Sequence, residues 1–117
     1  MLHLPVRGSG DGGIFTTLSD VHAFWSALLA GRIVSEASVA EMTRPHSEVR
    51  EESTRYGLGF WLHETGDAVM LTGYDAGVSF RSAHEPSTET TYTVISNTSD
   101  GAWDLVELLD ERLLGHD

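Results

Sequence analysis

A run of short, strand-like segments separated by tight turns dominates the second half of the sequence. The segments are rich in aromatic, β-branched or small apolar residues, and turns that contain glycine, proline or aspartate separate them. Parallel neighbours need crossover connections of about a dozen residues or more, and these turns are shorter. We therefore expect antiparallel pairing among the segments 56–62, 68–72, 78–83 and 90–96.

Amphipathic helical patterns flank this region on both sides. Thr17 and Asp20 resemble the start of a capping box, and apolar residues recur at helical spacing from there until Gly31. Ser35 begins a shorter helical segment that stops before Pro45. The predicted fold class is α+β: a small antiparallel sheet of about three or four strands, with N-terminal helices and a C-terminal helix packed on it.

The chain has the length of one domain, and we expect a single domain over residues 1–117. Its expected parts are a Gly-rich extended loop at 1–13, helices within 17–44, antiparallel strands within 56–96 and a closing helix at 100–114. The polar, charge-rich stretch from residue 46 to residue 55 is typical of a solvated loop.

Charge and composition exclude several functional classes. The net charge is −11 and the basic residues are scattered, so we expect no nucleic-acid partner. Without lysine, the chain alone cannot form a Walker-type phosphate loop, a Schiff base or a serine–lysine pair, and arginine stays protonated and cannot replace that base. It has no cysteine nucleophile, and its histidines lack metal-ligand spacing. We predict no metal and no cofactor.

The sequence offers no membrane segment. No apolar run approaches the roughly 18–20 residues that a membrane-spanning helix requires. The first residues also lack the charged and then apolar build of a signal peptide, which slightly favours a cytoplasmic location without fixing it.

The segment 73–82, Gly-Tyr-Asp-Ala-Gly-Val-Ser-Phe-Arg-Ser, is the best candidate for a functional site. A short apolar run precedes its small residues, and an alternation of apolar and polar residues follows them. Glycine and alanine leave room for a ligand against the main chain. The pattern indicates one wall of an active site, built from a strand edge.

Several motifs, in this order along the chain, resemble the serine β-lactamase-related hydrolases, which include class C β-lactamases, penicillin-binding-protein-like D-peptidases and related esterases. The resemblance covers residues 11–114, and it depends on the shared order because each motif alone is weak. The matching segments are Asp11-Gly12-Gly13-Ile14-Phe15-Thr16-Thr17 with Asp20, Met42-Thr43-Arg44-Pro45, Tyr56-Gly57-Leu58-Gly59-Phe60, Gly73-Tyr74-Asp75-Ala76-Gly77 and Val94-Ile95-Ser96-Asn97.

The resemblance also implies what this chain lacks. In the family, a Ser-x-x-Lys motif supplies the acylated serine and its lysine partner, and a Tyr-x-Asn motif assists proton transfer. Both precede the matched region, and a chain without lysine cannot contain the first. The chain is thus similar to the C-terminal segment of a longer hydrolase that acts on β-lactams, D-amino-acid peptides or esters, and we expect it to be inactive alone.

By this resemblance, Tyr74, Asp75 and Ala76 occupy the family's third motif, Lys/His-Thr/Ser-Gly. The family's strand donates a backbone N–H to the acyl oxyanion, and the alignment assigns that amide to Gly77. Tyr74 removes the motif's positive charge and Asp75 adds a negative one, so we expect poor recognition of a substrate carboxylate. Arg81 is a candidate substrate-binding cation that would offset this charge.

Other interpretations stay open. Tyr74 is equally a strand aromatic with a solvated hydroxyl, and residues 11–13 are better explained as a plain turn than as a functional motif. The alternative to a hydrolase segment is a non-enzymatic binding or interaction domain on the same fold. For the hydrolase interpretation we expect a small acyl compound as the substrate of the full-length protein. We also expect self-association or packing with a missing N-terminal region, because an unpaired strand edge and bared apolar surface promote both.

Overall fold

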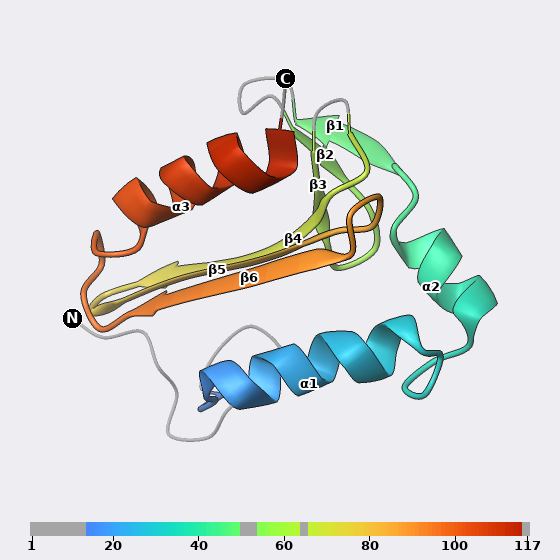
Figure 1. Cartoon of the computed structure of the whole chain (residues 1–117), viewed down its shortest axis with the longest axis horizontal. Coiled ribbons are helices and arrows are strands. Elements are labelled where there is room, and N and C mark those ends of the chain that lie inside the picture. Colours follow the sequence, from blue (N-terminus) through green and yellow to red (C-terminus); the bar gives the residue numbers. More distant parts are fainter. Residues whose placement is uncertain (1–13, 50–53, 64–65, 116–117) are drawn as a thin grey trace.

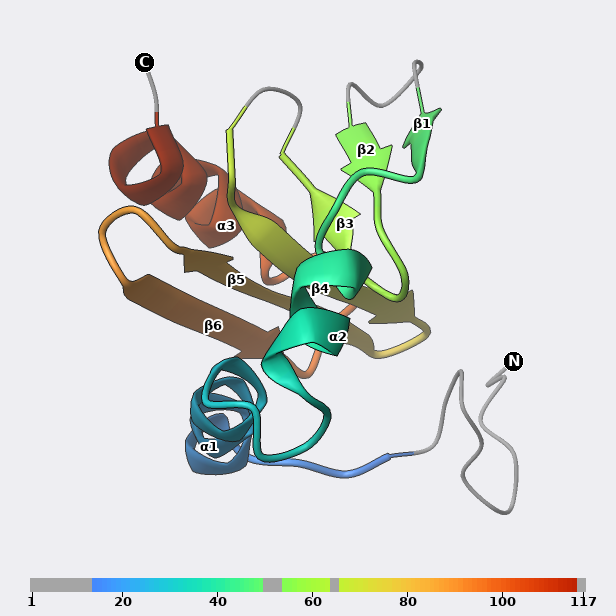
Figure 2. The same cartoon turned by 90° about the vertical axis from the view of Figure 1, so that its right-hand side faces the viewer.

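The computed structural model describes residues 14–49, 54–63 and 66–115, which form one antiparallel sheet with helices packed against it (Figure 1). Two of the helices, α1 and α3, lie on opposite sides of the sheet (Figure 2). The predicted loop at 1–13, with its Asp11-Gly12-Gly13 motif, lies outside the described residues. The architecture confirms the predicted α+β class.

Each strand of the sheet pairs antiparallel with its neighbour in the sequence, so the order in space is β1-β2-β3-β4-β5-β6. Short turns between neighbouring strands make this order possible. The longest strands are β4, β5 and β6, and they correspond to the last three predicted segments. The bounds are Ser47–Val49 for β1, Thr54–Tyr56 for β2, Trp61–Leu62 for β3, Val69–Asp75 for β4, Val78–Glu85 for β5 and Thr90–Ser96 for β6.

The described part of the sheet contains six strands, more than the three or four expected. The predicted segment 56–62 is split between β2 and β3, because the chain turns between Gly57 and Phe60. Gly57 N–H donates to the Phe60 carbonyl at 2.8 Å, and Gly59 has φ +90°, which favours glycine. The first strand, β1, forms within the stretch that the sequence indicated as a loop, where it pairs with β2 at the edge of the sheet.

The helix α1 spans Leu18–Leu29 and α2 spans Glu36–Met42. Both predicted N-caps are confirmed, because the Thr17 and Ser35 side chains accept hydrogen bonds from backbone N–H groups of the first turn. The closing helix begins at Trp103 rather than at residue 100: α3 spans Trp103–Leu109, and a π-helical turn, η2, continues it over Asp110–Gly115. No described helix is long and apolar enough to cross a membrane.

Two apolar clusters hold the helices to the two faces of the sheet. The alternation of side chains along β4 sends Val69 to the α1 face and Met70 to the α3 face. The α1 cluster contains Val21, Trp25, Leu28, Phe60, Leu62 and Val69. The α3 cluster contains Ala68, Met70, Ala83, Tyr92, Val94, Ala102, Val106 and Leu114.

Trp25 is the central contact between α1 and the sheet. Its side chain is 1% exposed, and its indole Nε1–H donates to Ser82 Oγ at 2.7 Å. The indole also packs against Phe60 and stacks on the imidazole of His84. This combination of burial, hydrogen bond and ring contacts fixes the position of α1 under β5.

Candidate functional site

The outer half of β4 has a pairing partner on one side only, among the residues that the structure describes. β3 pairs with Val69 and Met70, whereas β5 pairs with the whole of β4 up to Asp75. The stretch from Leu71 to Asp75 therefore has no described strand paired with it on the side away from β5. We call this stretch the β4 edge.

The register shows which backbone groups point outward at the β4 edge. A two-residue turn joins β4 to β5, and Asp75 and Val78 form the pair that closes this hairpin. The closing pair of a two-residue hairpin is hydrogen-bonded, and hydrogen-bonded pairs alternate with non-hydrogen-bonded pairs along the ladder. Gly73 therefore bonds to β5, whereas the N–H and C=O groups of Thr72 and Tyr74 point away from it.

Four of the predicted site residues, Tyr74, Asp75, Ala76 and Gly77, lie at the tip of this hairpin. The Tyr74 side chain is 65% exposed, and its ring centroid lies 6.0 Å from that of Trp103. Asp75 Oδ1 accepts a hydrogen bond from Ala76 N–H at 2.7 Å, so this carboxylate orders its own turn. The tip is therefore an exposed, aromatic and acidic corner at the end of the β4 edge.

Gly77 lies in the turn itself, at φ +81°. Its N–H donates to Ser99 Oγ at 2.9 Å, and the Ser99 hydroxyl donates in turn to the Asp75 carbonyl at 2.9 Å. This chain of hydrogen bonds ties the hairpin tip to the loop that precedes α3. The Gly77 amide thus serves the turn in this structure, and its assignment as an oxyanion donor stays a prediction.

Arg81 lies on the α3 face of the sheet, opposite Thr72 in the ladder. Its Nε donates to Thr72 Oγ1 at 2.8 Å and its Nη1 to Asp110 Oδ2 at 3.2 Å. The Tyr92 hydroxyl also donates to Asp110, and burial, followed by this hydrogen bond, raises the pKa of Tyr92 above its usual range. These contacts make Arg81 part of a polar network between β4, β5 and the helix end; its role in substrate binding stays a prediction.

Two residues of the β4 edge, Thr72 and Gly73, were not among the predicted site residues. Thr72 and Gly73 match the last two positions of the Lys/His-Thr/Ser-Gly motif, and both lie on the β4 edge. In this register, Leu71 takes the cationic position and packs, half-buried, against the α1 cluster. The Thr-Gly pair itself was the signal that could have found this register.

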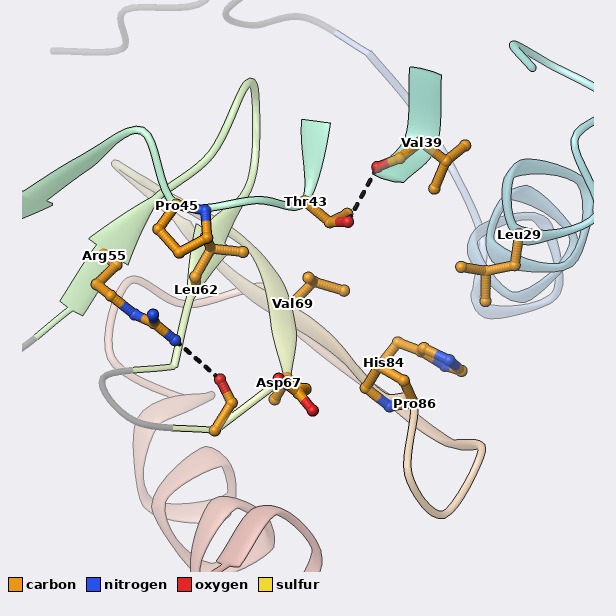
Figure 3. Close-up of a pocket in the computed structure, with 12 residues that line it drawn as sticks. Leu29, Val39, Thr43, Pro45, Arg55, Leu62, Asp67, Val69, His84 and Pro86 are labelled. Atoms are coloured by element: carbon orange, nitrogen blue, oxygen red, sulfur yellow. Dashed lines mark hydrogen bonds between the residues drawn. The ribbon is translucent and has the colours of Figure 1, made fainter. Parts of the chain in front are cut away.

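A separate cavity lies at the other end of β4, where the strand begins, between α1, α2 and the sheet (Figure 3). Its volume is about 410 Å³. Most of its lining is apolar, and the polar side chains are Thr43, Arg55, Asp67 and His84. The full lining is Leu29, Val39, Thr43, Pro45, Arg55, Leu62, Gly66, Asp67, Ala68, Val69, His84 and Pro86. We call this space the α2 cavity.

His84 is the buried polar side chain of the α2 cavity, with 8% of its surface exposed. Its Nδ1 shares a hydrogen bond of 2.8 Å with Thr91 Oγ1, and its ring stacks on Trp25. Burial lowers the pKa of His84, and the charges of Glu85 and Glu89 oppose this effect. Within the described ranges, no group of three or more His, Cys, Asp or Glu side chains is arranged to hold a metal ion.

Comparison with known proteins shows a similarity to a penicillin binding protein. No protein-family model matches the chain, and no curated protein matches it. A solved structure, the crystal structure of penicillin binding protein from Bacillus halodurans, is 32% identical with a TM-score of 0.84. The match covers 94% of this chain and 34% of that one, so this chain spans about a third of its length. The chain therefore has a penicillin-binding-protein or β-lactamase-like fold, which indicates a β-lactamase- or transpeptidase-like origin.

Proposed function

We propose that residues 1–117 form the C-terminal domain segment of a serine hydrolase related to class C β-lactamases, D-peptidases and esterases. In this proposal the segment supplies one wall of the catalytic cleft, and the rest of a longer protein supplies the nucleophile. The observation that carries the proposal is the β4 edge, because it leaves outward backbone donors where the resemblance predicts the cleft. The similarity to a penicillin binding protein supports the same interpretation.

In this proposal the wall acts through the backbone of Tyr74. When a serine oxygen attacks an acyl carbonyl, negative charge develops on the carbonyl oxygen, and preorganised N–H donors stabilise that charge. The register gives Tyr74 an outward N–H, and no side-chain or backbone acceptor among the described residues engages it. Tyr74 N–H is therefore a better-placed oxyanion donor than Gly77 N–H, which Ser99 already engages.

The same edge favours an acyl substrate without a carboxylate. The motif register with Thr72 and Gly73 places Leu71 where the family carries a cation, and the register with Tyr74 places an uncharged ring there. Asp75 adds a negative charge at the tip, and the candidate substrate-binding cation, Arg81, is engaged by Asp110. A neutral ester or amide can bind at the hairpin tip without charge repulsion, whereas the Asp75 carboxylate repels an anionic β-lactam.

The test uses the full-length protein that contains this segment and follows hydrolysis of a p-nitrophenyl ester. Proline at position 74 removes the outward N–H and leaves the hydrogen bonds between β4 and β5, because that N–H is not part of the ladder. We expect Tyr74→Pro to lower kcat about 100- to 1000-fold, the cost of one oxyanion donor. Tyr74→Phe keeps the N–H and should stay within a few-fold of the parent enzyme.

Two outcomes contradict the proposal. One is a full-length protein without a Ser-x-x-Lys motif before this segment; the other is a Tyr74→Pro enzyme that retains the parent kcat. A second measurement concerns the segment alone, incubated with a fluorescent penicillin. It should take up no covalent label, because it contains no lysine to activate a serine. Labelling of the isolated segment would show that our assignment of the nucleophile is wrong.

A second candidate function, as an interaction domain, is favoured by bare apolar side chains before and at the start of α1. Ile14 is 85% exposed, Phe15 91% and Leu18 57%. Neighbouring exposed apolar side chains mark contact surfaces. We propose that this surface packs against a preceding region of a longer protein or, in the isolated chain, against a second copy. Sedimentation over a wide concentration range should then show dimers that Phe15→Ser weakens; a monomer throughout argues against it.

A further inference from the structure

The residues that line the α2 cavity belong neither to the β4 edge nor to the proposed hydrolase chemistry. It lies at the opposite end of β4 from the hairpin tip, and its walls come from α1, α2 and strands β2 to β5 (Figure 3). Its volume of about 410 Å³ falls in the range of small-molecule sites, which are mainly apolar and carry a few polar anchors. The α2 cavity therefore has the size and character of a ligand site.

The polar anchor is the imidazole of His84. Thr91 engages Nδ1, whereas Nε2 has no hydrogen-bond partner within the part of the chain that the structure describes. His84 is more than nine-tenths buried, and a buried ring nitrogen without a partner is costly. A ligand that reaches this nitrogen would recover that cost.

The tautomer of His84 determines which ligand groups can hydrogen-bond to its Nε2. If Thr91 donates to Nδ1, Nε2 carries the proton and donates; if Nδ1 donates to Thr91, Nε2 accepts. A hydroxyl group suits both cases because it donates and accepts, whereas a carboxylate suits only the first.

The charges in the lining disfavour an anionic ligand. Arg55 donates from Nε to the His63 carbonyl and from Nη2 to the Gly66 carbonyl, both at 3.0 Å, so its guanidinium is held by the chain itself. Asp67 carries the opposite charge on the same wall. The rest of the lining offers no compensation for a buried ion, and burying one without a partner is strongly unfavourable.

We propose that the α2 cavity binds a small, neutral, mainly apolar molecule with one hydroxyl group, and that this hydroxyl hydrogen-bonds to Nε2 of His84. The ligand lies among Leu29, Val39 and Val69 and contacts the ring that supports Trp25. This binding is independent of the hydrolase proposal, because the α2 cavity and the β4 edge do not share residues.

The test is a titration of the ¹⁵N-labelled chain at pH 7.5 with 2-naphthol, followed by NMR. The indole N–H signal of Trp25 should shift and saturate with a Kd on the order of 1 mM or tighter, as expected for a ligand of this size. The signal of Trp103, on the other face of the sheet, should stay in place. The anion 2-naphthoate should bind at least about 10-fold more weakly.

Three variants make the test specific to the α2 cavity. Val39→Phe fills the space from α2 and should weaken binding at least about 10-fold, whereas Ala40→Phe adds the same ring at an exposed position of the same helix and should bind like the parent chain. His84→Phe keeps a ring beside Trp25 but removes Nε2, and it should weaken binding about 10-fold.

Each of the following results overturns the proposal: no saturable shift of Trp25, a Val39→Phe chain that binds as tightly as Ala40→Phe, or equal affinity for 2-naphthol and 2-naphthoate. Unchanged affinity in His84→Phe overturns the role of the imidazole. Should His84→Phe not fold, the comparison of the two ligands and the pair of α2 variants decides the question without it.

Discussion

The hydrogen bond between Trp25 and Ser82 allows a quantitative test of how α1 is held to the sheet. In Trp25→Phe, loss of part of the buried ring should cost about 1–2 kcal/mol and loss of the hydrogen bond about 1 kcal/mol, so the free energy of unfolding should fall by about 2–3 kcal/mol. Ser82 keeps its hydrogen bonds to Tyr92 and Thr93, so its hydroxyl stays satisfied in this variant.

The reciprocal variant, Ser82→Ala, leaves the indole N–H of Trp25 buried without an acceptor, at a cost of about 1–3 kcal/mol. The double variant removes donor and acceptor together, so its loss should be about 1 kcal/mol smaller than the sum of the single losses. Urea unfolding followed by circular dichroism measures all the variants without relying on indole fluorescence, and the m-value should stay constant. Additivity within about 0.5 kcal/mol would refute the predicted contact.

Three further predictions concern single positions. Burial lowers the pKa of His84 in the folded state below its unfolded value near 6.5, so the unfolded state binds a proton first as the pH falls. The urea midpoint should therefore be constant above about pH 7.5 and decline below about pH 6.5. His84→Gln should make the midpoint depend less steeply on pH. Tyr92→Phe should cost about 1.5 kcal/mol in thermal unfolding, because it removes the hydroxyl that donates to Asp110; a cost near zero would show that this bond contributes nothing. Gly57→Ala should cost about 2–3 kcal/mol, because its Cβ would lie 2.1 Å from the Met42 carbonyl oxygen; parent-like stability would contradict this close approach.

The sequence predicted the fold wherever its signals were local. Thr17 and Ser35 cap helices because their side chains and the following N–H groups are close in sequence. The long strands β4, β5 and β6 followed from alternation and from turn residues. The strand β1 could not be predicted in this way, because Ser47-Glu48-Val49 is polar and short, and only its pairing with β2 makes it a strand.

The sequence placed its candidate site on a strand edge, and the role of that edge as a site stays a prediction. The segment that contains Tyr74 lies at a strand edge, but the direction of each N–H depends on the register between β4 and β5. A one-residue shift of this register would reverse every N–H direction along β4. The alignment favoured Gly77 because it placed the family's third motif on Tyr74, Asp75 and Ala76; in the structure the Gly77 amide donates to Ser99. The α2 cavity could not be predicted at all, because it brings His84 together with residues of α1, α2 and β2 that are distant in sequence.

The most direct test of the account is hydrogen exchange of single amides along β4, measured by NMR on the chain. Exchange rates should alternate along the strand: the outward amides of Thr72 and Tyr74 should exchange rapidly, and the amides of Leu71 and Gly73, bonded to β5, should be protected. Protection of Tyr74 as strong as that of Gly73, or the reverse alternation, would mean that the β4 edge presents no outward donor at Tyr74. The proposed wall of the cleft would then have no oxyanion donor at Tyr74.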